Sequence, residues 1–280
     1  MNDSPMNDRR MDDRRASGAA RPFGLQLSTA SGEAVAAAAL EHPRAPEDGV
    51  ALVVTPNIDH VARLRHTPEL ATAYRHAELI VCDGWPVRFY ARLRGLDVQP
   101  VTGCELAARL MRPGGYAPWQ RLFFVVDSPR TEAALRAWAA TKGIAERTAS
   151  FVPPFGFEHD EALCRSLAEA VRAHGTTLLI MAVGAPRSEI FVDRLHDALP
   201  SCWAFCVGQA VKIEVGLVRR APPGIQAIGL EWLWRVAQEP RRLARRYVVS
   251  SVGFALAVLE DLRSPRAAAA AAAGEAGGAP

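Results

Sequence analysis

Leu79-Ile80-Val81-Cys82-Asp83-Gly84-Trp85-Pro86-Val87 is a short apolar run that ends in an acid and a glycine. Together with the helix-like residues 87–93, it predicts a buried parallel strand, a tight turn and a helix. Asp83 would stand where the strand ends, and ligands collect at that edge of open α/β sheets. A carboxylate there can be a general base, a ribose anchor, or a turn or helix-cap residue, and the stretch alone leaves these roles open.

Four further segments repeat this pattern of an apolar run, a turn and a helix. The runs cover residues 50–55, 122–126, 176–183 and 203–207. Continuous apolar runs are typical of strands that are buried on both faces of a parallel sheet. Residues 151–157 contain too much proline for a central strand and are expected to form a loop over one end of the sheet. The predicted fold class is α/β, with a Rossmann-like, predominantly parallel sheet flanked by helices and a C-terminal helical appendage.

The 280 residues are 49% hydrophobic and 22% charged, with a formal net charge of +3. This composition excludes a chain that is disordered throughout, and the mild net charge does not suggest nucleic-acid binding. Five cysteines at irregular spacings lie mostly inside apolar runs, which is typical of reduced cytoplasmic thiols and not of disulfides or a zinc site. The N-terminus lacks the apolar region of a secretory signal, and the apolar run at residues 248–259 is too short to span a bilayer. A cytoplasmic protein is expected.

Changes of composition divide the chain into four parts. Residues 1–22 are expected to be a disordered leader, residues 23–216 the α/β domain, residues 217–263 a basic amphipathic appendage and residues 264–280 a low-complexity tail. The appendage arginines are Arg219, Arg220, Arg235, Arg241, Arg242, Arg245 and Arg246. Pro240 is expected to kink or restart the appendage helix. Such a segment can bind a membrane or an acidic partner, or can be a solvated helix packed on its own domain.

Several motifs in a fixed order and spacing add a resemblance to a known family. They are Thr55-Pro56-Asn57, Asp83-Gly84, Val101-Thr102-Gly103, Gly184-Ala185-Pro186-Arg187-Ser188-Glu189, Arg219-Arg220-Ala221-Pro222 and Gly229-Leu230-Glu231-Trp232. With them, the chain resembles the WecG/TagA/CpsF glycosyltransferases from about residue 50 to about residue 262. Several separate motifs make this resemblance more specific than one short pattern would.

Members of that family move a sugar from a UDP-sugar to a lipid-diphosphate-linked sugar at the cytoplasmic membrane face, with inversion and without a metal. The resemblance implies the same reaction in cell-surface polysaccharide assembly, with Asp83 as the general base and Thr55 and Asn57 in the substrate pocket. A sugar hydroxyl is a poor nucleophile, and a carboxylate within hydrogen-bond reach can take its proton as the new bond forms. The other residues expected to bind substrate are Gly84, Thr102, Gly103, Gly184, Pro186, Arg187, Ser188, Glu189, Gly208, Gln209, Arg219, Arg220 and Arg242.

Three segments depart from the family pattern. Many members have Gln where this chain has Ser188, and a Gly-Gly loop where it has Val126-Asp127. The usual Gly-Gly-Ala-Phe-Asp segment appears as Gly208-Gln209-Ala210-Val211-Lys212, which exchanges an acid for a base. These departures bear on the nucleotide contacts and on the identity of the donor.

Two other classes of protein fit parts of the sequence. Five βα units also suit a dehydrogenase, but the chain lacks a Gly-x-Gly-x-x-Gly after a strand with an acid about twenty residues further on. A catalytically inactive nucleotide-sugar-binding or membrane-associated scaffold would keep the fold and use Asp83 only structurally. The expected partners are a UDP-sugar, a polyprenyl-diphosphate-linked (undecaprenyl-type) sugar and the inner face of the cell membrane, without nucleic acid, metal or cofactor. Homo-oligomerisation stays open.

Overall fold

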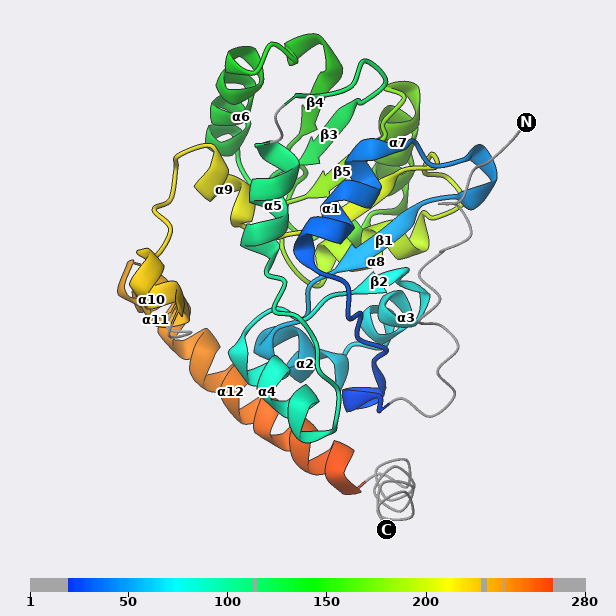
Figure 1. Ribbon diagram of the computed structural model, residues 1–280. Helices are drawn as coiled ribbons and strands as arrows, with labels where there is room; N and C mark the ends of the chain where they lie inside the picture. The colour runs from blue at the N-terminus through cyan, green and yellow to red at the C-terminus, as the bar shows by residue number, and fades with distance from the viewer. Residues whose placement is uncertain (1–19, 113–114, 228–230, 239, 264–280) are drawn as a thin grey trace, which may run out of the picture.

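A six-stranded parallel sheet runs through the centre of the molecule (Figure 1). The computed structural model describes residues 20–112, 115–227, 231–238 and 240–263. The strands are β1 (Ala51–Val54), β2 (Leu79–Ile80), β3 (Leu122–Val125), β4 (Thr148–Phe151), β5 (Leu178–Met181) and β6 (Trp203–Cys206), in the order β2-β1-β6-β5-β3-β4. The predicted α/β class with a predominantly parallel sheet is confirmed.

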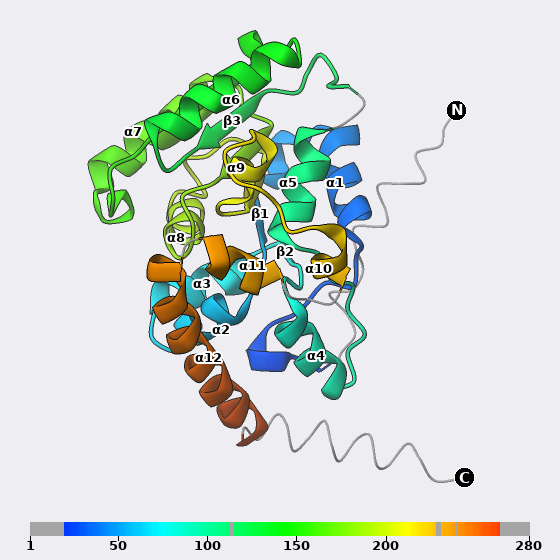
Figure 2. The ribbon, with the colours of Figure 1, turned by 90° about the vertical axis from the view of Figure 1, so that its left-hand side faces the viewer.

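Helices cover both faces of this sheet (Figures 1 and 2). The α-helices are α1 (Gly32–Glu41), α2 (Ile58–Leu64), α3 (Pro68–His76), α4 (Trp85–Leu93), α5 (Gly103–Met111), α6 (Pro129–Thr141), α7 (Glu161–Ala173), α8 (Arg187–Arg194), α9 (Ala210–Glu214), α10 (Pro223–Ala227), α11 (Glu231–Gln238) and α12 (Pro240–Arg263). Leu52 and Val54 of β1 belong to a core shared with α2, α3, α7 and α8. Ala51 and Val53 belong to a second core, shared with α1, α5, α6 and α9. The alternation of side chains along each strand therefore fills two layers.

The edge strand β4 was not predicted from the sequence. Its residues are only half-buried and include Thr148 and Ser150, so β4 lacks the apolar run that marks a central strand. Phe151, assigned above to a loop, is the last residue of β4, and this part of the prediction is wrong. The chain then leaves the sheet as a loop at residues 152–156, as expected, and continues in a short 3-10 turn, Phe157–His159.

Helix α12 lies along α2 in both ribbon views (Figures 1 and 2). A Cβ atom at Gly253 would lie 2.6 Å from the Cβ atom of Ala62, so the two helices approach closely at this point. The Ser250 hydroxyl donates a hydrogen bond of 2.7 Å to the Asp59 carboxylate. Helix α11 ends at Gln238 and α12 begins at Pro240, which confirms the predicted restart of the helix.

Two parts of the expected organisation lie outside the described residues. They are residues 1–19, which make up most of the expected leader, and residues 264–280, the expected tail. Gly229 and Leu230 of the last motif also lie outside them. Within the described ranges, no helix has both the length and the apolar character needed to cross a membrane.

Candidate active site

Three expected site residues follow neighbouring strands at the carboxyl edge of the sheet. Thr55 and Asn57 come after β1, and Asp83 comes after β2, which pairs with β1. The backbone N–H of Asp83 donates to the carbonyl oxygen of Pro56 at 3.2 Å, so the two segments are in direct contact. On the other side of β1, strand β6 leads into α9, which covers the opposite face of the sheet from α2. In open α/β sheets, ligands bind where neighbouring strands lead to opposite faces of the sheet in this way.

The surroundings of Asp83 raise the pKa of its carboxyl group from 3.8 to about 6. Burial is the largest cause, because it disfavours the charged form. Arg235, His60 and the hydrogen bond from the backbone N–H of Gly103 act in the opposite direction, and the charge of Glu231 adds to the rise. A carboxyl group whose pKa is near neutrality can accept a proton from a bound molecule and release it again.

Helix α5 begins next to Asp83. The Thr102 hydroxyl accepts the backbone N–H of Glu105 at 3.0 Å and caps the helix, and Gly103 follows it with its N–H bonded to Asp83. A Cβ atom at Gly103 would lie 3.2 Å from the carbonyl oxygen of Val207 and 3.4 Å from the hydroxyl oxygen of Thr55. Glycine therefore lets α5 approach the ends of β1 and β6 at this point.

Thr55 and Asn57 hold the backbone after β1 in place. The buried Thr55 hydroxyl donates to the carbonyl oxygen of Cys206 at 3.2 Å and ties the end of β1 to the end of β6. The Asn57 side-chain oxygen accepts the backbone N–H groups of Asp59, at 2.9 Å, and of His60, at 3.4 Å. Asn57 is thus the N-cap of α2, and it directly follows Pro56, which bonds to Asp83.

Helix α11 brings further charges to this region. The Arg235 guanidinium donates to the sulfur of Cys104 at 2.8 Å. The Glu231 carboxylate lies 3.7 Å from Arg235 and 3.9 Å from Arg220. Arg235 was assigned above to the appendage and not to the site, yet its charge acts on Asp83. The sequence held a signal for it, since Glu231 of a family motif precedes it by four residues, the spacing of an ion pair on a helix.

The longest motif forms the loop after β5 and the start of α8. Gly184 has a φ angle of +82°, and its carbonyl oxygen accepts the backbone N–H and the hydroxyl of Ser188, both at 3.3 Å. The Arg187 guanidinium donates to a backbone carbonyl in this loop and lies 4.9 Å from the ring centroid of Phe155. Pro186 precedes α8. Ser188 and Glu189 are buried, so the partly exposed Arg187 is the charged side chain of this motif that a ligand could reach.

A family model for the glycosyl transferases of the WecG/TagA/CpsF family matches residues 20–268, which include all these site residues. The chain belongs to this family. The resemblance drawn from the motifs is therefore confirmed, and membership of a glycosyltransferase family implies an enzyme that acts on a sugar donor and an acceptor. This finding goes against the alternative of a dehydrogenase.

Two departures of this glycosyltransferase from the family pattern meet in space. The Lys212 ammonium group lies 2.5 Å from one carboxylate oxygen of Asp127, and the other oxygen accepts the Thr131 hydroxyl at 2.9 Å. Asp127 follows β3 and Lys212 follows β6, so their ion pair joins segments on either side of β5. The positive charge of Lys212 is therefore paired with the carboxylate of Asp127, at a position where many family members have glycine.

The other expected substrate-binding residues of the glycosyltransferase take several places. Gly84, with a φ angle of +92°, precedes α4, and Gly208, with a φ angle of +56°, precedes Gln209 at the start of α9. Arg219 is exposed, and its carbonyl oxygen accepts two side-chain N–H groups of α11. The Arg220 Nε atom is buried and has no hydrogen-bond partner among the described residues. Arg242 lies in α12, and its side chain is outside the described part of the structure.

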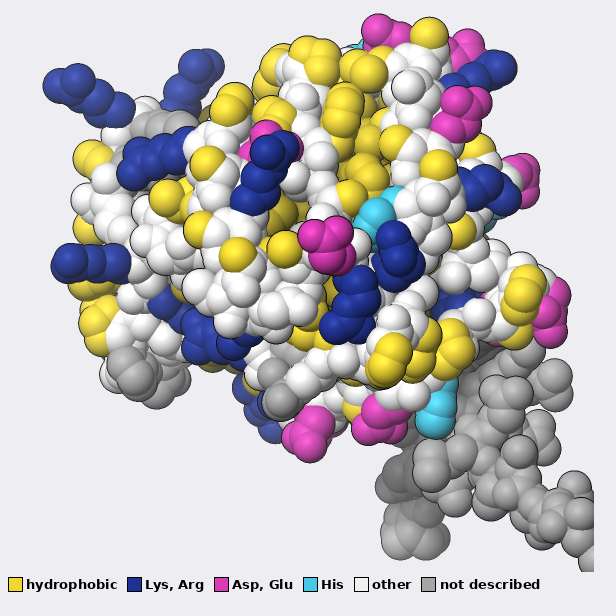
Figure 3. Space-filling model, turned by 90° about the horizontal axis from the view of Figure 1, so that it is seen from above, with side chains coloured by type: hydrophobic (Ala, Val, Ile, Leu, Met, Phe, Trp, Pro, Cys, Tyr) yellow, Lys and Arg dark blue, Asp and Glu magenta, His cyan; other side chains and the backbone are white. Residues whose placement is uncertain are grey.

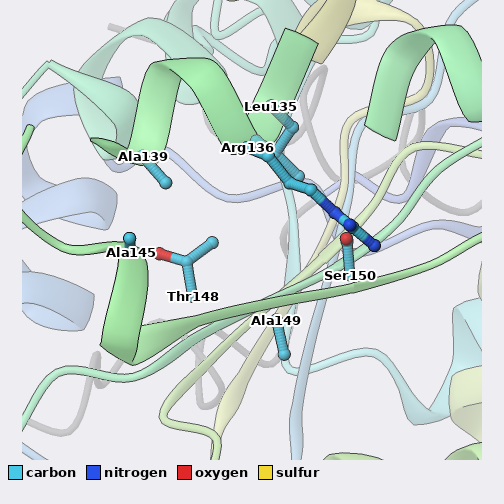
Figure 4. Close-up of a pocket in the computed structure, with 7 residues that line it drawn as sticks. All are labelled: Leu135, Arg136, Ala139, Ala145, Thr148, Ala149 and Ser150. Atoms are coloured by element: carbon cyan, nitrogen blue, oxygen red, sulfur yellow. The ribbon is translucent and has the colours of Figure 1, made fainter. Parts of the chain in front are cut away.

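A surface pocket of about 370 Å³ lies away from this site, between α6 and β4 (Figure 4). Leu135, Arg136 and Ala139 line it from α6, and Thr148 and Ser150 line it from β4. Because β4 and β2 form opposite edges of the sheet, the pocket is remote from Asp83.

Charged side chains on the face seen in Figure 3 are dispersed. Lys and Arg stand at several separate places on it, among acidic and hydrophobic side chains. Proteins that bind nucleic acid typically gather such cations into a patch or stripe. Among the residues that the structure describes, no group of three or more His, Cys, Asp and Glu side chains could hold a metal ion.

Proposed function

We propose that the enzyme moves a sugar from a UDP-sugar to a polyprenyl-diphosphate-linked sugar, with inversion and without a metal, and that Asp83 is the general base. The observation that carries this proposal is the Asp83 carboxyl group. It lies at the carboxyl edge of the sheet, accepts the Gly103 N–H, and has a pKa raised to about 6. Its basicity therefore suits removal of a hydroxyl proton near neutral pH.

The proposed step is a single displacement. The acceptor hydroxyl oxygen forms a bond to the anomeric carbon of the donor, and the bond from that carbon to the diphosphate oxygen breaks. The hydroxyl proton goes to Asp83, and the electron pair of the broken bond leaves with UDP. One displacement inverts the anomeric centre, so a single carboxylate is enough.

The leaving UDP gains negative charge on its diphosphate, and positive groups must meet that charge. Arg187 offers a guanidinium group after β5, and Arg219 and Arg220 offer two more before α10. Arg235 adds a positive charge near Asp83. The loops at Gly184 and Gly208 lie at the same edge of the sheet and would contribute backbone N–H groups.

Helix α12 supports the proposal of a lipid-linked acceptor, because its outer side suits a membrane surface. Leu243, Ser250 and Ala257, which are spaced by seven residues, are buried. The opposite side of the helix carries Val248, Val252 and Leu259, which are 65%, 58% and 47% exposed, respectively. Arg241, Arg245 and Arg246 are exposed in the first two turns. An apolar row next to arginines favours binding to anionic lipids, so we place the enzyme at the cytoplasmic face of the membrane.

Helix α4 presents a second apolar surface, directly after Asp83 and Gly84. Trp85 and Phe89 are stacked, with ring centroids 4.9 Å apart, and both are largely exposed. Large exposed aromatic side chains are typical of surfaces that bind a partner or a membrane interface. The start of the acceptor's lipid chain, which follows its diphosphate, would lie near such a surface.

A donor screen tests the proposed function. Purified enzyme is incubated with several UDP-sugars, with or without a short-chain polyprenyl-diphosphate-linked sugar, and UDP release is measured. We expect one donor to give release that depends on the acceptor, and NMR of the product to show an inverted anomeric centre. Retention of configuration, or UDP release that no lipid-diphosphate acceptor stimulates with any donor, would contradict the proposal.

A further inference from the structure

A buried pair of ionisable side chains lies behind Asn57. The Glu189 side chain of α8 is 1% exposed, and one of its carboxylate oxygens lies 3.4 Å from Nε2 of His60 in α2. The His60 side chain is 12% exposed. The other carboxylate oxygen of Glu189 is buried without a hydrogen-bond partner among the described residues. His60 is therefore the ionisable side chain that the structure pairs with this buried acid.

The second ring nitrogen of His60 faces Asn57. Its Nδ1 atom lies 2.9 Å from the side-chain oxygen of Asn57 and 3.4 Å from the backbone nitrogen of the same residue. A protonated ring donates to the Asn57 oxygen and to Glu189 at the same time, whereas a neutral ring that donates to Glu189 accepts from the Asn57 backbone. In both states the ring links Glu189 to Asn57.

These contacts fix the orientation of the Asn57 amide. Its oxygen accepts the N–H groups of Asp59 and His60 and lies against the His60 ring. The NH₂ group, with two donors, is the part of the side chain that remains for a ligand. Asn57 directly follows Pro56, whose carbonyl oxygen accepts the backbone N–H of Asp83, so the residue that carries this NH₂ group adjoins the segment of the proposed base.

We infer that His60 is a positioning residue of the transfer reaction: held by Glu189, it orients the amide of Asn57 toward the substrate, and it lies close enough to Asp83 for a charge on its ring to favour the ionised carboxylate. The inference rests on the proposed function, in which Asp83 takes the acceptor proton. A purely structural role explains the pair less well. Buried ion pairs contribute little net stability compared with well-packed apolar side chains, so a protein without a use for this charge gains little by keeping it.

Other groups also face the two side chains and bear on any pH dependence. Around Asp83 they are Arg235 and Glu231 from α11, Cys104 and the Gly103 N–H from α5, Tyr74 from α3 and the adjoining Cys82. Around His60 they are Glu189 from α8, Asn57 of its own helix, and Tyr74, whose ring centroid is 6.5 Å away. Among the charged ones, Arg235 has the same effect on Asp83 as His60, so removal of His60 weakens but does not abolish the ionised state of Asp83.

The test compares His60→Gln and Glu189→Gln with a matched control. The control is His76→Gln, because His76 in α3 also pairs with an acid of α8, Asp193, at 2.7 Å, but its side chain is 61% exposed. We expect kcat on the lipid-linked acceptor to fall about 10- to 100-fold in both test variants, which is less than the loss of a direct transition-state donor. The acid limb of the kcat–pH profile should move to higher pH in His60→Gln, because Asp83 loses a neighbour that lowers its pKa. The control should keep the wild-type rate and profile.

Asp83→Asn, assayed in parallel, separates the two proposals. If it retains wild-type turnover, the proposed base is wrong whatever His60 does. If it is inactive while the His60 and Glu189 variants keep the wild-type rate and acid limb, the inference about His60 is overturned and the proposed function stands. A lower melting temperature of His60→Gln with an unchanged acid limb would also overturn it, since that shows a structural role only.

A measurement on the unmutated chain covers the case in which His60→Gln does not fold. We expect ¹⁵N NMR of the ring nitrogens to show His60 with a proton on Nε2 at pH 7, and Glu189→Asp to change the His60 signals while leaving those of His76 in place. A His60 ring without a proton on Nε2 would contradict the bridge to Glu189.

Discussion

Asp83 carries a carboxyl group whose pKa rises from 3.8 to about 6 when the chain folds. Between these two pH values, the unfolded chain has released the proton while the folded protein still holds it. The free energy of unfolding therefore falls as the pH rises through this window, and a folded protein at pH 7 carries the full cost of the buried charge. A residue kept at such a cost is a strong candidate for function.

Asp83→Asn should therefore make the protein more stable at pH 7. A shift of about two pKa units corresponds to at most about 3 kcal/mol, and Asn keeps the shape of the side chain without the charge. Urea unfolding at pH 7 and at pH 4 measures the effect, which should be largest at pH 7 and nearly vanish at pH 4. A variant less stable than the unmutated chain at pH 7 would show that the carboxylate is a structural turn or cap residue.

At this scale the sequence locates only some of the candidate site. Asp83, Thr55 and Asn57 each follow an apolar run directly, so their place at the edge of the sheet can be predicted from the chain itself. His60 and Arg235 lie inside helices, and their closeness to Asp83 depends on how α2 and α11 pack. No local pattern encodes that packing.

At the scale of the elements, α12 contacts the rest of the molecule mainly by packing along α2. A Cβ atom at Gly253 would meet Ala62 at 2.6 Å, whereas nothing lies within 4 Å of a Cβ atom at Gly224 in α10. Alanine favours a helix over glycine by about 1 kcal/mol, so propensity alone predicts that both Gly→Ala changes stabilise.

We expect Gly253→Ala to destabilise the protein by about 1–3 kcal/mol, because the added methyl group forces the helices apart, while Gly224→Ala is neutral or stabilising. The free energies of unfolding of the two variants, measured side by side in urea, check this. A stable Gly253→Ala variant would mean that α12 does not pack tightly on α2 in solution.

The strands show why sequence predicts some elements better than others. β1, β2, β3, β5 and β6 appear as apolar runs because they are buried on both faces. β4 is an edge strand with Thr148 and Ser150, and its polar residues resemble those of a loop. The position of α11 against α5 could not be predicted either, because it depends on long-range contacts such as that between Arg235 and Cys104.

For the whole molecule, the proposed membrane surface is the outer side of α12. The double variant Val252→Glu and Leu256→Glu places two negative charges on exposed apolar positions of this side. We expect its binding to anionic vesicles to fall at least roughly tenfold. Each substitution removes an apolar side chain from the membrane contact and adds a negative charge that the anionic lipid headgroups repel. Co-sedimentation at several salt concentrations measures this binding.

Ala133→Glu serves as the control, because Ala133 is exposed on α6, on the far side of the molecule from α12 (Figure 1). It should bind vesicles as the unmutated chain does. Undiminished vesicle binding by the double variant would show that the outer side of α12 is only a solvated helix face.

The proposed reaction also predicts that turnover survives metal removal. Arg187, Arg219, Arg220 and Arg235 can meet the charge of the leaving diphosphate, and guanidinium groups bind phosphate oxygens strongly without a metal. UDP release should proceed at an unchanged rate after dialysis against EDTA. If activity disappeared with EDTA and returned with Mg²⁺ or Mn²⁺, the metal-independent mechanism would be wrong.

The central claim is that Asp83 removes the proton of the acceptor hydroxyl, and the rate of UDP release by Asp83→Asn on the lipid-linked acceptor at pH 7 tests it most directly. The account predicts a rate lower by about 10²- to 10⁴-fold, the usual contribution of a general base, in a variant that is folded and still binds UDP. Turnover by this variant at the unmutated rate would contradict the claim.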